Sequence, residues 1–384
     1  MEVLALGGCG GMGRHAVRTA LRFDFVDRVI VADRDHAAAC GSRAAAAGVD
    51  VTDAVALRAL LTEAEIVLNT VGPFYRFGVP ILEAAIDADC HYFDINDDWE
   101  PTLEMLELHG RAEAKGLTAV IGLGASPGIS NMLAAKAIAA LDSVEEVLTG
   151  WSLGGIGEEG DFVEPSASGP SAALVHWMHQ CSGSIRLWQD GGYADVSPVE
   201  ERQIDFPDAG VGRGWTVGHP EALTLPLTFP MRASANVMLG PGAVMAMLAQ
   251  IRDAIDAGQL TVEEAAKTMS GPVPDDMKAS MGEEVTLPPL FALAIGSSGG
   301  VPKRVGAFVQ GAPDGGMGGV TGIPLALGLP LLSLGRIAKR GVFAPEAVID
   351  PDEFFTLLAP YCKAPGSSTP FASPGEFVRV TEAG

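Results

Sequence analysis

The stretch VLALGGCGGMG (residues 3–13) decides the fold of this chain. Four apolar residues with the pattern of a buried strand lead into a glycine-rich turn, and an amphipathic helix pattern follows. A second apolar run, RVIVA (residues 28–32), ends on Asp33, about 20 residues after the last glycine of the turn. This order of strand, G-x-G-x-x-G turn, helix, strand and acid predicts a dinucleotide-binding fold.

Each position of the turn has a mechanical reason. Gly8 permits the tight turn, Gly10 lets the backbone approach a pyrophosphate, and Gly13 lets the helix press against the strand. Gly11 and Met12 lie between them, so we expect these five residues to line the diphosphate. The helix that follows presents unpaired N–H groups and a partial positive charge to the phosphates.

The acid at the end of the second strand bears on the choice of cofactor. Asp33 would accept hydrogen bonds from the adenosine ribose hydroxyls and repel a 2′-phosphate, which favours NAD. Arg34 follows at once, and an arginine there can hold that phosphate. We therefore expect NAD, with NADP as the alternative.

Composition excludes several classes of function. A length of 384 residues suggests two domains. The net charge of −23 argues against nucleic-acid binding and against an anionic membrane surface. Five scattered cysteines without C-x-x-C spacing, and no visible signal peptide, indicate reduced thiols in a cytoplasmic protein. The long uncharged run from Gly315 to Gly335 contains prolines and many glycines, so we interpret it as buried loop and helix rather than a membrane span.

The chain beyond Asp33 alternates short apolar runs with helix patterns. An alanine-rich helix is expected over residues 36–47, and strands are expected over the ranges given below. This alternation predicts an α/β fold with a Rossmann-type, doubly wound parallel sheet. Ligands of such sheets lie beyond the carboxyl ends of the strands, so the loops that follow the later strands should open into one crevice. The expected strands are 49–51, 65–70, 91–95 and 117–121, and the loops are 71–78, 94–98 and 122–131.

Several blocks of sequence resemble the saccharopine dehydrogenase-like family, which includes saccharopine reductase, carboxynorspermidine dehydrogenase and lysine 6-dehydrogenase. The length of the chain and Asp33 are most similar to the lysine 6-dehydrogenase branch. The blocks are residues 8–15, VGPFYRFG (71–78), ADCHYFD (88–94), GASPGISN (124–131), TGIP (321–324) and IDPDEFF (349–355).

The resemblance implies a division of the chain. Residues 1–130, completed by residues 321–384, form the dinucleotide-binding domain. Residues 131–320 form an α+β domain with a mixed, largely antiparallel sheet, which covers the crevice and makes the contact of a homodimer. The strands expected there from pattern are 184–188, 193–196, 200–206, 215–217 and 305–310.

The loop after the fourth strand carries several candidate residues. The backbone of Thr70, Val71 and Gly72 should run beside the nicotinamide ribose. Phe74 and Tyr75 supply aromatic surface for the substrate, unless both pack under the second domain. Arg76 binds a substrate carboxylate or is a surface residue of a helix start. Asp53, after the third strand, lies beside the adenine or caps the next helix.

The remaining candidates lie later in the chain. Asp94 ends the fifth strand and would hold a cationic amine or take a proton, whereas Asp98 is expected to cap a helix. Ser126 stands where several family members have Asp, in contact with the substrate amine. His176 and Arg213 are substrate candidates in the second domain. Arg213 is expected in a glycine-rich loop (210–214), and His219 in another loop (219–221) that could face the same cleft. His176, His179 and Cys181 lack an acid to complete a ligand set, so no metal is expected.

The function implied is that of an NAD(P)-dependent oxidoreductase acting on the carbon–nitrogen bond of an amino acid or related amine. Hydride passes between the nicotinamide and the carbon that bears nitrogen. Two alternatives stay open. One is an imine-reducing enzyme of the saccharopine reductase or carboxynorspermidine dehydrogenase type, and the other is a cofactor-binding protein whose catalytic site has lapsed.

Overall fold

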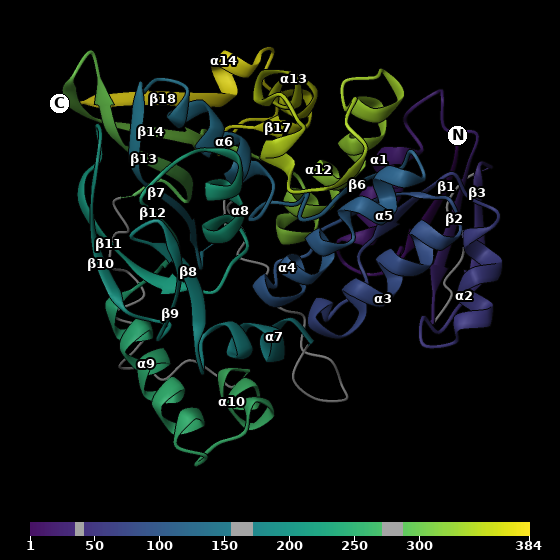
Figure 1. The fold of residues 1–384 in the computed structure, drawn as a ribbon, viewed down its shortest axis with the longest axis horizontal. Coiled ribbons are helices and arrows are strands. Elements are labelled where there is room, and N and C mark those ends of the chain that lie inside the picture. The colour runs from purple at the N-terminus through teal and green to yellow at the C-terminus, as the bar shows by residue number, and fades with distance from the viewer. Residues whose placement is uncertain (35–41, 155–171, 271–286) are drawn as a thin grey trace. The chain divides into compact units, whose positions relative to one another are not determined.

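The structure is a computed structural model that describes residues 1–34, 42–154, 172–270 and 287–384. The chain forms two compact units, each of which is discontinuous in sequence (Figure 1). The first unit contains Met1–Met132 and Gly311–Phe377, and the second contains Leu133–Gln310 and Val378–Gly384.

The first unit is built on a parallel sheet of seven strands in the order β16-β6-β5-β4-β1-β2-β3. The order reverses beside β1, which pairs with β2 on one side and β4 on the other. Ligands of open α/β sheets bind at such a reversal. The predicted α/β class with a parallel Rossmann-type sheet is therefore confirmed. The strands are β1(Glu2–Leu6), β2(Arg28–Asp33), β3(Ala44–Gly48), β4(Ile66–Asn69), β5(His91–Asp94), β6(Thr118–Val120) and β16(Gly341–Phe343).

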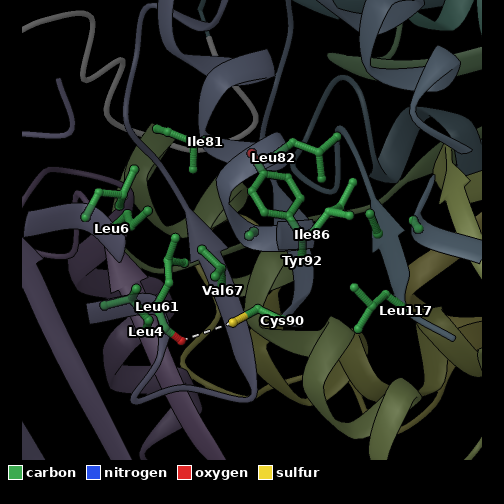
Figure 2. Packing of buried hydrophobic residues seen from close by; sticks show 14 of the residues in the cluster. Leu4, Leu6, Leu61, Val67, Ile81, Leu82, Ile86, Cys90, Tyr92 and Leu117 are labelled. Carbon is green, nitrogen blue, oxygen red and sulfur yellow. Dashed lines mark hydrogen bonds between the residues drawn. The ribbon is translucent and has the colours of Figure 1, made fainter. Parts of the chain in front are cut away.

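Helices cover both faces of this sheet. On one face, alternate strand residues such as Leu4, Val67 and Tyr92 pack with residues of α2 to α5 in one buried cluster (Figure 2). Phe93, the neighbour of Tyr92, points to the opposite face, where a Cβ added to Gly328 of α12 would lie 2.7 Å from its ring. The helices concerned are α2(Ala54–Leu61), α3(Phe74–Asp87), α4(Trp99–Glu107), α5(His109–Ala114) and α12(Gly316–Ser333).

Helix α12 is long and apolar enough to cross a membrane by length and composition alone. Within the window that meets this test, 72% is buried inside the structure, which is typical of a core helix. A Cβ on Gly322 would lie 2.2 Å from the carbonyl oxygen of Met12, and one on Gly318 would lie 2.6 Å from that of Gly11. The glycines of α12 therefore let it pack against the backbone that opens α1(Gly13–Ala20).

Three local predictions are wrong. Residues 44–47 were expected at the end of an alanine-rich helix, and residues 49–51 were expected as the next strand. Instead, residues 44–48 form β3, which pairs in parallel with β2 from Val29↔Ala44 to Asp33↔Gly48, and residues 49–51 follow it outside any strand. Pairing with a neighbouring strand overrides the helix propensity of alanine here. Residues 35–41 of that expected helix lie outside the described part. Helix α3 begins at Phe74, inside the range 71–78 that was expected as a loop, and it contains Pro80.

The second unit contains a mixed, mostly antiparallel sheet of nine strands, as predicted. Its main path is β10-β11-β12-β7-β13-β14-β18, in which only the β12–β7 pair is parallel. Strands β8 and β9 extend from β12. The strands are β7(Ser143–Ser152), β8(Ile185–Gln189), β9(Gly192–Val196), β10(Glu201–Phe206), β11(Gly210–Val217), β12(Ala233–Leu239), β13(Leu290–Ser298), β14(Val301–Val309) and β18(Val378–Ala383).

The end of the chain differs from the expectation. Residues 321–384 were assigned as a whole to the dinucleotide-binding domain, but β18 pairs with β14 of the second unit, from Arg304↔Ala383 to Val309↔Val378. Among its described residues, the second unit has the α-helices α7(Ala172–Gln180), α8(Glu221–Thr228), α9(Gly242–Asp256) and α10(Val262–Met269). The division between the units falls within α6(Ile129–Ile138).

Candidate functional site

The glycine-rich turn lies between the end of β1 and the start of α1. Gly7 has a φ of +71°, so the residue of the turn with a left-handed backbone is Gly7, which the G-x-G-x-x-G pattern did not include. Gly8 instead allows close packing, since a Cβ there would lie 2.9 Å from Val31 Cγ1. Gly13 is the tightest position, because its Cβ would lie 2.1 Å from the carbonyl oxygen of Gly7. A Cβ on Gly11 would meet nothing within 4 Å, which leaves open space at the turn.

Asp33 faces this turn. One carboxylate oxygen accepts a hydrogen bond from the backbone N–H of Cys9 at 3.2 Å, and the other accepts one from the N–H of Arg34 at 2.8 Å. The carboxylate is thus held beside the glycine-rich turn, at the end of β2. This is the place where the sugar next to the diphosphate lies in dinucleotide-binding folds.

The loop after β4 lies against the same turn. The Thr70 hydroxyl is 3.0 Å from the carbonyl oxygens of both Leu6 and Gly7, and the N–H of Thr70 donates to Leu6 at 2.9 Å. The Val71 N–H donates to the side-chain oxygen of Asn69 at 3.0 Å. The predicted backbone Thr70–Gly72 is therefore fixed at the switch point of the sheet, between β1 and β4.

Asp94, expected to contact the substrate, is completely buried at the end of β5. One oxygen accepts from the Tyr92 hydroxyl at 2.9 Å, and the other from the N–H groups of Gly122 at 2.7 Å and Asn96 at 3.0 Å. Asn69 donates in turn to the Tyr92 hydroxyl at 2.9 Å. Asp94 was expected to hold a cationic amine or to take a proton. In the structure, both of its oxygens instead accept hydrogen bonds that join the loops after β4, β5 and β6.

Burial sets the charge state of this network. Burial of Asp94 raises the pKa of its carboxyl to about 7, although the hydrogen bonds from Gly122, Asn96 and Tyr92 oppose that rise. Burial also raises the pKa of the Tyr92 hydroxyl well above its usual value, and the nearby Asp94 carboxylate adds to the effect. The Tyr92 hydroxyl therefore keeps its proton and donates it to Asp94.

Two acids were candidates for helix caps, and the structure shows a cap for one of them. Asp53 accepts from the N–H groups of Val55 and Ala56, both at 3.0 Å, at the start of α2. Of the two roles expected for Asp53, the structure shows the helix cap. Asp98 was expected to cap α4, but its carboxylate makes no such bond there and instead accepts from the N–H of Tyr75 at 2.9 Å. It satisfies an N–H group in the first turn of α3.

The substrate candidates of the first unit differ in exposure. Phe74 is buried, whereas the neighbouring Tyr75 is 47% exposed. Ser126 is half-buried in the loop after β6, where the Ser126–Pro127 peptide bond is cis, as is Gly72–Pro73 before α3. Arg76 is exposed, and its guanidinium carbon lies 5.0 Å from the centre of the Phe77 ring. Tyr75, Arg76 and Ser126 are therefore at least partly exposed, whereas Phe74 is buried.

The candidates of the second unit lie on regular elements. His176 is half-buried on α7. Arg213 was expected in a loop but lies on β11, half-exposed, with its guanidinium 5.6 Å from the Trp215 ring and 3.8 Å from Glu201. Arg213 thus lies on a strand that pairs with β10, so the prediction of a loop at this position is wrong.

Two buried polar residues that bind each other, one at the start of α6 and one near the end of the chain, were missed as functional candidates. Asn131 is fully buried; its side-chain oxygen accepts from the Gly128 N–H at 2.7 Å, and its amide donates to Glu346 at 2.8 Å. Glu346 lies on the short 3-10 helix η1(Pro345–Ala347), so this bond ties the final third of the chain to the 124–131 turn. The turn motif marked Asn131, but no pattern marked its partner.

Together, the first unit has the parts that a dinucleotide requires. The glycine-rich turn (residues 7–13), here called the glycine cradle, leads into α1 at the point where the strand order of the sheet reverses. Open space lies over Gly11, and the acid Asp33 follows at the end of β2. These features define a dinucleotide-binding oxidoreductase fold, and the residues present fit NAD(P).

Comparison with known proteins gives the family. Residues 3–120 match the model of the saccharopine dehydrogenase NADP binding domain. The dinucleotide-binding part of the chain is thus similar to this family, in agreement with the resemblance of its sequence blocks. Its fold is also similar to that of apo saccharopine dehydrogenase (L-Glu forming) from Saccharomyces cerevisiae, with a TM-score of 0.60 and 16% identity over 100% of both chains.

Two curated proteins are similar in sequence. A probable mitochondrial saccharopine dehydrogenase-like oxidoreductase from Arabidopsis thaliana is 31% identical over 143 residues, which is 32% of this chain and only 31% of that protein. Carboxyaminopropylagmatine dehydrogenase from Synechocystis is 22% identical over 403 aligned residues, covering 93% of this chain and 94% of the relative. The second match extends over both units.

Proposed function

We propose that the protein is an NAD(P)-dependent oxidoreductase that acts on a carbon–nitrogen bond of an amino acid or related amine. The observation that carries the proposal is the convergence of four loops at the switch point of the first unit. The turn after β1 and the loop after β4 share the Thr70 hydroxyl, and the loops after β5 and β6 share the Asp94 carboxylate.

Each loop has a part in this function. The glycine cradle holds the diphosphate, Asp33 holds the adenosine ribose, and the backbone from Thr70 to Gly72 orients the nicotinamide ribose. The bound nicotinamide supplies or accepts the hydride. Tyr75, in the first turn of α3, offers an aromatic surface to the substrate.

The buried network has a positioning part. Asp94 joins the N–H groups of Asn96 and Gly122, and through Tyr92 and Asn69 it reaches the N–H of Val71. A site whose loops are held by internal hydrogen bonds keeps its groups in place while hydride moves. Ser126, four residues beyond Gly122, is thereby presented from a fixed loop.

Two reactions are candidates for this protein. The resemblance to the lysine 6-dehydrogenase branch favours oxidation of a primary amine. The relative that aligns over both units is named a carboxyaminopropylagmatine dehydrogenase, and this favours a larger substrate with a substituted nitrogen, formed by reduction of an imine. The first candidate has one small substrate, whereas the second requires an aldehyde and an amine.

A spectrophotometric screen of the purified protein separates them. Reduction of NAD(P) with lysine or another ω-amine supports the first candidate, and oxidation of NAD(P)H with an aldehyde plus an amine or amino acid supports the second. A Tyr75→Phe variant should keep cofactor affinity and raise KM for the active substrate. Tight cofactor binding without turnover of any amine, in either direction, would overturn the enzymatic proposal in favour of a lapsed site.

A further inference from the structure

The turn that carries Ser126 is closed on itself by backbone hydrogen bonds. The N–H of Gly124 donates to the carbonyl oxygen of Pro127 at 2.9 Å, and the N–H of Ile129 donates to that of Gly124 at 3.0 Å. A Cβ on Gly128 would lie 2.1 Å from the Gly124 carbonyl oxygen, so the two sides of the turn are in contact. Ser126 lies at the tip and is half-buried. A group that fixes this turn therefore also fixes the place of Ser126.

Asn131 holds the turn at the start of α6. Its side-chain oxygen accepts from the Gly128 N–H at 2.7 Å, in the way that the third residue of a helix reaches back to the residue before the helix. The side chain of Asn131 is fully buried. Rotation of its amide by a half-turn would bring the NH2 group against the Gly128 N–H, and two donors cannot bind each other. The bond therefore depends on a partner that orients the Asn131 amide.

Glu346 is that partner, and it comes from a distant part of the chain. Its Oε2 accepts from the Asn131 side-chain nitrogen at 2.8 Å, and Glu346 is only 6% exposed. A carboxylate oxygen in this place requires the NH2 group to face it, which turns the amide oxygen towards Gly128. Strand β16 pairs in parallel with β6 up to Phe343↔Val120, and η1 follows β16 directly. Because parallel neighbours end at the same edge of the sheet, an acid on η1 reaches the loop after β6.

We propose that Glu346 is a positioning residue of the reaction, which fixes Ser126 for contact with the substrate through the amide of Asn131. The inference rests on the proposed function and adds to it a residue outside both the matched range 3–120 and the sequence blocks that resemble the family. A tie between two segments needs no acid, since burial of a carboxylate costs free energy that an apolar contact does not. The acid adds a fixed direction of the Asn131 amide, which a site with one required geometry needs.

Steady-state kinetics test the proposal with the substrate that turns over in the spectrophotometric screen. Glu346→Leu removes the acceptor of the Asn131 amide and should raise KM about tenfold, with kcat changed by less than about threefold. Affinity for reduced cofactor should stay within about twofold of wild type. Ser126→Ala should raise KM by a similar factor. The two changes together should raise KM no more than either alone, because both remove the same contact.

An exchange of the two polar groups separates positioning from packing. Asn131→Asp places two carboxylates against each other and should raise KM as Glu346→Leu does. Asn131→Asp combined with Glu346→Gln rebuilds the bond in the reverse direction. The new amide donates to the new carboxylate, whose other oxygen still accepts from the Gly128 N–H. The KM of this double variant should return to within about threefold of wild type.

A matched control changes the same part of the chain without touching the turn. Asp350 caps α13(Pro351–Leu358), where its carboxylate accepts from two backbone N–H groups at 2.9 and 3.0 Å. Asp350→Ala should lower the melting temperature and leave KM unchanged. Hydrogen exchange of residues 122–132, followed by mass spectrometry, should be at least about tenfold faster in Glu346→Leu and unchanged in Asp350→Ala.

The outcomes separate this inference from the function on which it rests. Unchanged KM or unchanged exchange in Glu346→Leu would overturn it. Independent, multiplying effects of Glu346→Leu and Ser126→Ala would do the same, as would a failure of the exchanged pair to restore KM. Each of these results leaves the oxidoreductase proposal standing, because the wild type still turns over. A wild type that turns over no amine in either direction would overturn the proposed function, and with it the part of Glu346 in a reaction.

Discussion

Substitution of Gly13 by alanine tests the glycine cradle most sharply. The added Cβ would lie 2.1 Å from the Gly7 carbonyl oxygen and 2.8 Å from Gly8 Cα, both of which are backbone atoms. An ordinary contact needs at least 3.4 Å, so α1 and the end of β1 must move apart by about 1 Å. No flexible side chain can absorb this change.

The expected cost follows from overpacking of a tight interior. We expect Gly13→Ala to lower the free energy of unfolding by about 2 to 3 kcal/mol. For a domain of this size that loss lowers the melting temperature by roughly 4 to 10 °C. Because the N–H groups at the start of α1 move with the helix, affinity for reduced nicotinamide cofactor should fall at least about tenfold.

A matched control lies two residues away in the same turn. Gly11→Ala makes the same chemical change where a Cβ meets nothing within 4 Å. It should melt within about 1 °C of wild type, and it is a control for stability alone, because Gly11 is itself expected to line the diphosphate. Thermal unfolding measures the effect of both variants on stability, and fluorescence titration measures the cofactor affinity of Gly13→Ala. If Gly13→Ala melted like Gly11→Ala, the tight contact between α1 and β1 would be refuted.

Three other substitutions test other parts of the structure. Asp53→Ala removes a helix cap and should cost about 1 kcal/mol in urea unfolding with cofactor affinity unchanged; a large loss of affinity would instead mean a contact with the adenine. In the folded protein Asp94 keeps its proton up to about pH 7, whereas in the unfolded chain it releases the proton near pH 4. The free energy of unfolding of the wild type should therefore fall as the pH rises from about 4 to about 7, by up to about 1.4 kcal/mol per pH unit. Asp94→Asn should lack that contribution, and equal pH slopes in both proteins would contradict it. Gly322→Ala places a Cβ 2.2 Å from the Met12 carbonyl oxygen and should cost about 2 kcal/mol; unchanged melting would refute the close packing of α12 on α1.

The parallel sheet could be predicted because its signals are local. The turn at residues 7–13, the acid at residue 33 and the alternation of short apolar runs each follow from positions close in sequence. The alanines at 44–47 were misassigned because their state depends on pairing with β2, which lies earlier in the chain and supplies their hydrogen bonds. Local propensity cannot carry that information.

The site was predicted better in its backbone than in its side chains. The loops after β4, β5 and β6 do lie together, because the carboxyl ends of parallel strands share one edge. The roles of the acids could not be assigned, since these depend on partners distant in sequence. Asp98 binds the N–H of Tyr75, and Asn131 binds Glu346, 215 residues further on. The burial of Asp94, which gives it an internal rather than a substrate-binding role, cannot be predicted from the residues next to it in the sequence.

A crystal structure of the complex with reduced nicotinamide cofactor tests the central claim most directly. The diphosphate should lie over the N–H groups that open α1, between β1 and β4, with the adenosine ribose beside Asp33. Density for the cofactor at any other place, or a soaked and saturated crystal without it, would contradict the claim.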